Sequence, residues 1–297
     1  MDSRTKARRG LAIFFVVLIA GTAYIEHKIF VLGGDIGQHV NWIYALMWWV
    51  TVASVVARLI MRESPRDVSF RWGGWAGTRA MLVATALPLI VGLVAYGVAW
   101  NTGLAKFDPP NPTHPFLGIG LGGAPLVRLV KRLLVLFTVG GLLSCKSAAG
   151  EEIGWRGYML TRLVAAGIPA PILVSGIIWG LWHTPLIISG QYASGPHPVL
   201  SACLFMIDVG AAAFTFGWLR ISSRSVWPAI WAHGVWNAVI QGGFDASTAG
   251  YSVWVGESGV LTSIMTVLFA VVLYRLWPIS EQISTIRVKG AEVDSRH

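Results

Sequence analysis

The stretch AMLVATALPLIVGLVAYGVAW, residues 80–100, has no charged side chain. About 20 consecutive apolar residues are enough for an α-helix to cross the hydrocarbon core of a bilayer. A helix also satisfies its own backbone hydrogen bonds, which the interior of a membrane requires. This stretch therefore predicts a transmembrane helix, and it indicates that the chain is an all-α membrane protein.

The composition of the whole chain agrees with this prediction. Of the 297 residues, 55% are hydrophobic and 12% are charged. An average soluble domain is roughly a quarter charged, so this chain lacks the side chains that a water-facing surface needs. The composition excludes a soluble cytosolic enzyme, a disordered chain and a nucleic-acid-binding domain. We therefore expect the lipid bilayer as a partner and no nucleic acid.

Seven further apolar runs bring the expected number of spans to about eight. They cover roughly residues 10–24, 40–57, 133–167, 171–188, 199–219, 226–240 and 260–277. The predicted fold class is therefore an all-α polytopic transmembrane helical bundle. We divide it into N-terminal transmembrane helices and loops (1–125), a catalytic core that contains the polar motifs (126–245), and a last transmembrane helix with a polar cytoplasmic tail (246–297).

The basic side chains predict the orientation of this bundle. With eight spans both termini lie on one side, where Lys and Arg gather at the N-terminus, in residues 58–79, and at Arg156, Arg162, Arg220, Arg224, Arg275, Arg287 and Lys289. The opposite connections, residues 189–198 and 241–259, contain neither Lys nor Arg. Because cytoplasmic loops are enriched in these residues, we predict a multi-pass protein of a bacterial plasma membrane with cytoplasmic N- and C-termini. Three residues break the pattern, and either an interfacial amphipathic turn or a cavity lining would explain them: Arg128, Lys131 and Arg132.

Three polar motifs lie inside the apolar runs, where charged and histidine side chains are costly and usually functional. They are Glu151-Glu152-Ile153-Gly154-Trp155-Arg156, Trp179-Gly180-Leu181-Trp182-His183, and His233-Gly234-Val235-Trp236-Asn237. Taken singly, each motif has an ordinary explanation: a solvated helix end, a packed histidine, or a hydrogen bond between helices. Their occurrence together at one depth is what favours a functional site.

The spacing of the motifs from the expected turns predicts that common depth. Glu151 lies about 16 residues before a turn near residues 167–169, and His183 about 15 residues after it, which is roughly 20–24 Å along a straight helix. His233 and Asn237 follow a turn near residues 222–224 by about 9 and 13 residues, which is a comparable depth. We therefore expect side chains from three helices to meet.

Helical spacing also predicts which of these side chains share a face. Glu152 and Arg156 are four residues apart and suit an ion pair, whereas Glu151 is rotated by about 100° from Glu152. We assign Glu151 to the site and Glu152 to the pair with Arg156, and the reverse assignment stays open. Trp179 stands four residues before His183 and is expected to wall the imidazole.

A carboxylate, two imidazoles and an amide in one place suit the hydrolysis of a peptide bond. Glu151 can act as a general base on a water together with His183. His233 and Asn237 can donate hydrogen bonds to the developing oxyanion. The alternative is a tetrahedral metal site, for example for zinc, held by Glu151, His183 and His233 with one open position. Residue types alone do not decide between no cofactor and a divalent metal.

The three motifs, in this order, resemble the CPBP family of intramembrane proteases (CAAX protease and bacteriocin-processing, also called Abi). The pattern of that family is EExxxR, then an aromatic residue followed by xxxH, then HxxxN or HxxxD, and the resemblance covers roughly residues 145–240. One departure is Trp179, where the family more often has phenylalanine. The resemblance implies a membrane endopeptidase with a CAAX-protease-like core, in which Glu151 and His183 activate water while His233 and Asn237 stabilise the oxyanion.

We therefore predict an intramembrane endopeptidase that cleaves a membrane-anchored peptide or protein substrate. Eukaryotic members of the family that the chain resembles remove the last three residues of prenylated CAAX proteins, so a CAAX-like substrate is one candidate. The alternative is a non-enzymatic protein, either a proton-coupled transporter or an immunity or scaffold protein that keeps the motif. Intramembrane Glu and His side chains also build proton relays, but the sequence has no evident internal repeat of the kind common in transporters.

Overall fold

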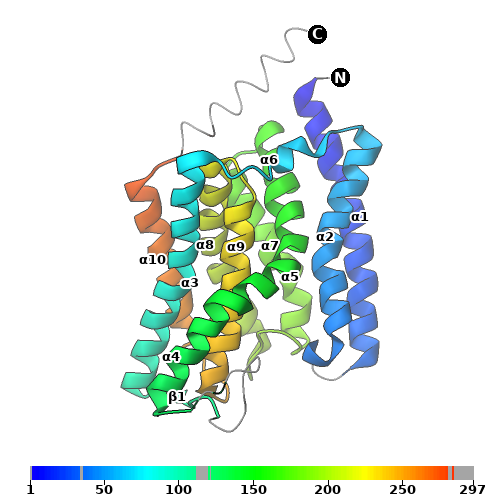
Figure 1. Ribbon diagram of the computed structural model, residues 1–297. Coiled ribbons are helices and arrows are strands. Elements are labelled where there is room, and N and C mark those ends of the chain that lie inside the picture. Colours follow the sequence, from blue (N-terminus) through cyan, green and yellow to red (C-terminus); the bar gives the residue numbers. More distant parts are fainter. Residues whose placement is uncertain (1, 34–35, 112–119, 121, 280–282, 284–297) are drawn as a thin grey trace.

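The computed structural model describes residues 2–33, 36–111, 120, 122–279 and 283. These residues form a bundle of long helices, most of which run along a common axis (Figure 1). The helices are α1 (Ser3–Leu32), α2 (Val40–Met61), α3 (Gly74–Thr102), α4 (Pro125–Val135), α5 (Gly141–Gly154), α6 (Leu160–Ala165), α7 (Pro171–Ile188), α8 (Pro198–Ser223), α9 (Trp227–Trp236) and α10 (Val260–Leu276). The prediction of an all-α polytopic fold is confirmed.

The predicted spans each have a helical counterpart. Among the described residues, α1, α2, α3, α7 and α8 are long and apolar enough to cross a membrane, and α10 is apolar but shorter. The two other predicted spans consist of consecutive shorter pieces. One runs from α4 through the π-helical η3 (Leu136–Gly140), α5 and the π-helical η4 (Trp155–Met159) to α6, and the other joins α9 to the π-helical η5 (Asn237–Phe244). The chain is an integral membrane protein.

The turn between α6 and α7 lies where the sequence predicts it. Gly167 has a φ of +70°, a conformation that glycine adopts without strain. Its N–H donates to the carbonyl of Val164 (3.1 Å) and the N–H of Ile168 donates to that of Leu163 (3.1 Å), which satisfies carbonyls at the end of the helix. Pro171 then begins α7, where a missing N–H costs nothing.

Shorter elements connect the helices at both ends of the bundle. The 3-10 turns are η1 (Ile36–His39), η2 (Pro65–Val68) and η6 (Asp245–Ser247). β1 (Lys106–Phe107) pairs antiparallel with β2 (Thr248–Ala249). β1 lies in the connection after α3, and residues 112–119 and 121 of that connection lie outside the described part. The pairing ties the connection after α3 to the connection after η5.

Glycines on α5 let this helix approach α2 closely. A Cβ atom added at Gly154 would lie 2.5 Å from the carbonyl oxygen of Val50, and one added at Gly150 would lie 2.9 Å from the Cα of Trp48. The hydroxyl of Thr51 donates to the carbonyl of Gly150 at 2.6 Å. Small residues allow such backbone approach in membrane proteins, and this contact fixes the segment that contains the paired carboxylates.

The basic residues that broke the predicted charge pattern lie on α4. Arg128 and Lys131 donate to backbone carbonyls just before the helix, at 3.0 and 2.8 Å, and Arg132 donates to the carbonyl of Gly242 at 2.8 Å. Neither of the two cavities described below has them in its lining. The same helix exposes apolar side chains at Leu126, Val127, Val130 and Leu134. Of the two explanations, an interfacial amphipathic segment fits this structure.

Candidate active site

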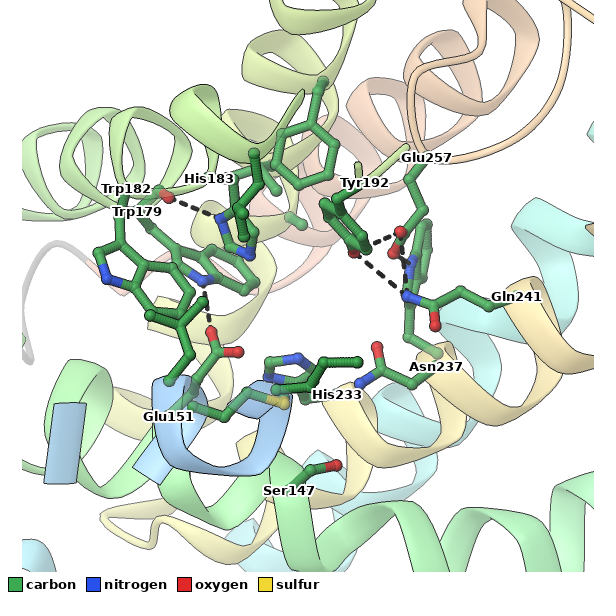
Figure 2. A pocket seen from close by; sticks show the side chains of 18 of the residues that line it. Ser147, Glu151, Trp179, Trp182, His183, Tyr192, His233, Asn237, Gln241 and Glu257 are labelled. Atoms are coloured by element: carbon green, nitrogen blue, oxygen red, sulfur yellow. Dashed lines mark hydrogen bonds between the residues drawn. The ribbon is translucent and has the colours of Figure 1, made fainter. Parts of the chain in front are cut away.

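Five of the side chains predicted for the site line one cavity of about 440 Å³, which we name the central cavity (Figure 2). They come from α5, from α7, and from α9 with the adjoining η5: Glu151, Trp179, His183, His233 and Asn237. The two other predicted residues, Glu152 and Arg156, do not line it. The structure thus separates the adjacent carboxylates, and the roles of all seven residues, four catalytic and three supporting, stay predictions.

Glu151 is buried and held by two indoles. Its Oε2 accepts a hydrogen bond from Nε1 of Trp179 at 2.8 Å and another from Nε1 of Trp155 at 3.2 Å. The carboxylate points into the central cavity (Figure 2). Because Oε2 accepts the hydrogen bonds of both indole N–H groups, Oε1 remains available to a molecule in the cavity.

Glu152 lies at the centre of a buried charged network. Its Oε1 accepts from Nη1 of Arg156 at 2.9 Å and contacts Nδ1 of His233, also at 2.9 Å. The guanidinium of Arg156 is stacked over the rings of Trp179 (4.0 Å) and Phe216 (4.7 Å), a favourable cation–π arrangement. Glu152 and Arg156 are 0% and 1% exposed, so each buried charge is stabilised by the opposite charge of its partner.

The position of His233 follows from this network. A carboxylate only accepts hydrogen bonds, so Nδ1 of His233 carries the proton that it shares with Glu152. The other ring nitrogen, Nε2, is then directed away from Glu152, on the side of the central cavity. The sequence predicted the Glu152–Arg156 pair but not that the same carboxylate would orient His233.

His183 is oriented by a backbone group. Its Nδ1 lies 2.9 Å from the carbonyl oxygen of Trp179, and a carbonyl only accepts, so Nδ1 carries the proton. In the neutral ring Nε2 is then an acceptor, and it faces the cavity (Figure 2). Aromatic rings surround the imidazole, with centroids at 4.8 Å for Trp182, 4.9 Å for Phe205 and 5.7 Å for Tyr192.

Asn237 begins a π-helical segment at the cavity wall. It follows His233 by four residues, about one helical turn, and is the first residue of η5. Its carboxamide faces the cavity (Figure 2). A second π-helical segment, η4, begins directly after the α5 turn that contains Glu151 and Glu152. π-Helical turns are rare and occur often at functional sites, because they turn side chains away from the regular helical positions.

A second carboxylate, Glu257, faces the same cavity. It accepts hydrogen bonds from the hydroxyl of Tyr192 (2.5 Å), from Nε1 of Trp236 (2.8 Å) and from Nε2 of Gln241 (3.0 Å). Nε2 of Gln241 also lies 3.2 Å from the hydroxyl of Tyr192. These residues form a polar wall opposite Glu151 (Figure 2).

The sequence did not predict this polar wall. One signal was available, because His233, Asn237 and Gln241 follow one another at intervals of four residues and so share a helix face. Tyr192 and Glu257 gave no such signal, since each lies in a connection whose folding against the bundle no local pattern encodes.

The three residues of the metal-site alternative, Glu151, His183 and His233, line the same cavity. Within the part of the chain that the structure describes, no three His, Cys, Asp or Glu side chains are grouped so that they could hold a metal ion. Each donor that this alternative named keeps one atom toward the cavity, because Oε2 of Glu151 accepts from two indoles and Nδ1 of His233 is bonded to Glu152, which leaves Oε1 of Glu151 and Nε2 of His183 and His233. The choice between a metal and no cofactor stays a prediction, and we derive no chemical step through a metal.

Comparison with protein families gives a match to the core of the chain. A family model described as type II CAAX prenyl endopeptidase, Rce1-like, matches residues 128–239. This segment contains all three polar motifs and the helices that hold them around the central cavity.

A curated relative points the same way. Over 82 residues the chain is 29% identical to a CAAX prenyl protease 2 of Methanococcus maripaludis, an alignment that covers 26% of this chain and 30% of that relative. The chain thus aligns with less than a third of the length of this relative. The family match over the three motifs, the second match and the polytopic helical fold support one assignment. Residues 128–239 of the chain are similar to the CAAX proteases, members of the CPBP family that the three motifs resemble.

Proposed function

We propose that this protein is an intramembrane endopeptidase that hydrolyses a peptide bond with water activated by Glu151 and His183. The observation that carries the proposal is the meeting of Glu151, His183, His233 and Asn237 in one cavity. Two of these groups present acceptors to the cavity, and two are suited to donate to an oxyanion. This is the complement that water attack on an amide requires.

Water activation follows from the two acceptors. A water between Oε1 of Glu151 and Nε2 of His183 donates one hydrogen bond to each of them, which leaves a lone pair of the water oxygen free for attack. As that oxygen bonds to the scissile carbonyl carbon, Glu151 takes up the proton that the water loses. General-base catalysis of this kind typically contributes about 10²–10⁴-fold to the rate.

The developing oxyanion is assigned to His233 and Asn237. The Glu152 carboxylate stabilises positive charge on the His233 ring, so that Nε2 can also carry a proton and donate. The amide of Asn237 supplies a second donor. Collapse of the intermediate then breaks the C–N bond, and the proton held by Glu151 passes to the leaving amine.

The surroundings of the site favour a membrane-anchored peptide as substrate. The lining of the central cavity includes apolar side chains from α2 and α8, among them Ile43, Leu46, Met47, Phe205 and Val209. A cavity of this kind can accept an apolar anchor beside the scissile bond. Lipidated peptides and transmembrane segments are therefore the substrate classes to be tried first.

The proposal is tested by single substitutions in the purified full chain. Glu151→Ala and His183→Ala should each lower cleavage of a lipidated reporter peptide by about 10²-fold or more, because each removes an acceptor from the attacking water. Glu26→Ala is a matched control, since Glu26 is a buried carboxylate of α1 that does not line either described cavity. Undiminished cleavage by folded Glu151→Ala protein would contradict the proposal, whereas absence of cleavage by the folded wild type would favour a non-enzymatic role.

A further inference from the structure

The two ends of the bundle differ in charge. The end that holds the N-terminus of α1 also holds the α2–α3 connection, α6, the α8–α9 turn and the end of α10 (Figure 1). Among the described residues this end has the basic side chains Arg4, Lys6, Arg8, Arg9, Arg58, Arg62, Arg66, Arg71, Arg79, Arg162, Arg220, Arg224 and Arg275. The opposite end has fewer, at Lys28, Lys106, Arg128, Lys131 and Arg132. By the positive-inside rule, the N-terminal end faces the cytoplasm.

The central cavity is sealed toward the N-terminal end. The chain that continues from Glu151 toward α6 places Trp155, Arg156, Tyr158 and Met159 there, and all four are 0–1% exposed. Trp218 of α8 is likewise fully buried. A layer of large side chains packed this completely leaves no path for a polypeptide from the basic end.

The central cavity extends instead toward the opposite end. Part of its lining comes from connections at that end, namely Gly37 before α2, Tyr192 after α7 and Glu257 after η5. A second cavity of about 460 Å³, which we name the loop cavity, lies there. Its lining is drawn from residues 191–194, 241, 245, 248, 250–252 and 255–258.

The two cavities share a wall. Tyr192, Gln241 and Glu257 line both of them, and they are the residues joined by the hydrogen bonds described above. Three polar side chains between two cavities offer hydrogen-bond partners to an extended backbone. They would also replace their mutual hydrogen bonds by hydrogen bonds to water at little cost in free energy.

From these observations we infer that the active site is entered from the non-cytoplasmic side of the membrane, through the loop cavity and past Tyr192, Gln241 and Glu257. The substrate class is then a membrane-anchored polypeptide whose cleavage site lies at or beyond the outer face. A prenylated protein on the cytoplasmic face would not reach Glu151. The loop cavity contains Asp245 and Glu257 and no Lys or Arg in its lining, so it disfavours acidic substrate segments.

This inference rests on the proposed function, because only a protease has a substrate to admit. Its test, however, does not require activity. Cys145 and Cys203 are first replaced by alanine in the full chain. Single cysteines are then placed in the loop cavity (Ser194→Cys), in the central cavity (Ser147→Cys) and on the N-terminal end (Arg66→Cys). Spheroplasts that express each variant are treated with a cationic, membrane-impermeant methanethiosulfonate, which an acidic cavity does not repel.

The expected result is modification of Ser194→Cys and Ser147→Cys in intact spheroplasts, and of Arg66→Cys only after permeabilisation. The opposite pattern, with Arg66→Cys reactive in intact spheroplasts and Ser194→Cys protected, would overturn the inference. Reaction of Ser147→Cys from the cytoplasmic side alone would overturn it as well. Monodisperse elution of each purified variant shows beforehand that it has folded.

A second measurement connects entry to cleavage. A bulky maleimide attached to Ser194→Cys should slow peptide cleavage by the purified protein relative to the same variant unmodified, whereas the same group on Arg66→Cys should not. Equal cleavage before and after modification at Ser194→Cys would contradict entry through the loop cavity. If no variant cleaves any peptide, the proposed function fails while the labelling pattern still decides the side of entry.

Discussion

Two adjacent carboxylates in this protein have different environments. Glu151 accepts from two indole N–H groups and keeps an oxygen toward the central cavity, whereas Glu152 is bound by Arg156 and His233 in the protein interior. Neighbouring carboxylates that are separated by their surroundings take separate roles in hydrolytic enzymes. We therefore assign the chemistry to Glu151 and the positioning of His233 to Glu152.

This assignment predicts the effect of neutralising Glu152. Glu152→Gln keeps the shape of the side chain but leaves Arg156 buried without its counter-charge, and breaking a buried pair typically costs about 3–5 kcal/mol. We expect a lower melting temperature and a loss of cleavage, because His233 is no longer held. Glu63→Gln is the matched control: Glu63 pairs with Arg162, which Asp67 also binds. A Glu152→Gln variant as stable and active as wild type would contradict the assignment.

At the scale of the helices, the contact between α5 and α2 holds the carboxylates at their depth. Gly154→Ala would place a methyl group 2.5 Å from the carbonyl oxygen of Val50, and forced overpacking costs about 1–3 kcal/mol. We predict a lower melting temperature in detergent together with reduced cleavage. Gly97→Ala on α3 is the control, since nothing lies within 4 Å of the added atom, and it should be neutral or slightly stabilising. Equal stability of the two variants would contradict this account.

The connection after η5 contains a further carboxylate, the half-buried Asp245. It is bonded to the hydroxyl of Tyr96, and burial raises its pKa from the usual 3.8 to about 7. Because the pKa of Asp245 is higher in the folded than in the unfolded state, its carboxyl group makes its full contribution to the stability of the fold below pH 4. That contribution is lost as the pH rises toward 7. We predict that Asp245→Asn raises the melting temperature at pH 8 by about 2–4 °C, corresponding to about 1 kcal/mol, and has less effect at pH 5. A variant whose melting temperature changes equally at both pH values would contradict this.

For the molecule as a whole, the hydropathy pattern sufficed to predict the helical bundle. Apolar runs mark the helices because a membrane-spanning segment must be apolar along its length, and Gly167 before Pro169 marks the turn between α6 and α7. The sequence also placed Glu151, His183, His233 and Asn237 at one level, where the structure brings them into one cavity. Their roles, the domain boundaries and the orientation in the membrane remain predictions.

Other features could not be predicted because they arise from tertiary contacts. The π-helical segments η4 and η5 have no sequence pattern that separates them from ordinary helix. The pairing of β1 with β2 involves two residues from each strand, which is too short for an alternating pattern. Glu257 reaches the central cavity because a connection folds back against α9, and this places it beside Tyr192 and Gln241.

In the proposed mechanism Glu151 activates the attacking water without a metal. Its most direct test compares the purified full-length wild type with Glu151→Gln in the presence of a strong chelator, with cleavage and binding of one labelled lipidated peptide measured on the same samples. The amide oxygen of Gln can still accept from the two indoles, so the cavity should keep its shape. We expect the chelator to leave wild-type cleavage unchanged, and we expect Glu151→Gln to bind the peptide normally but to cleave it about 10²–10⁴-fold more slowly. Cleavage by Glu151→Gln at the wild-type rate, or loss of wild-type cleavage in the chelator, would contradict this mechanism.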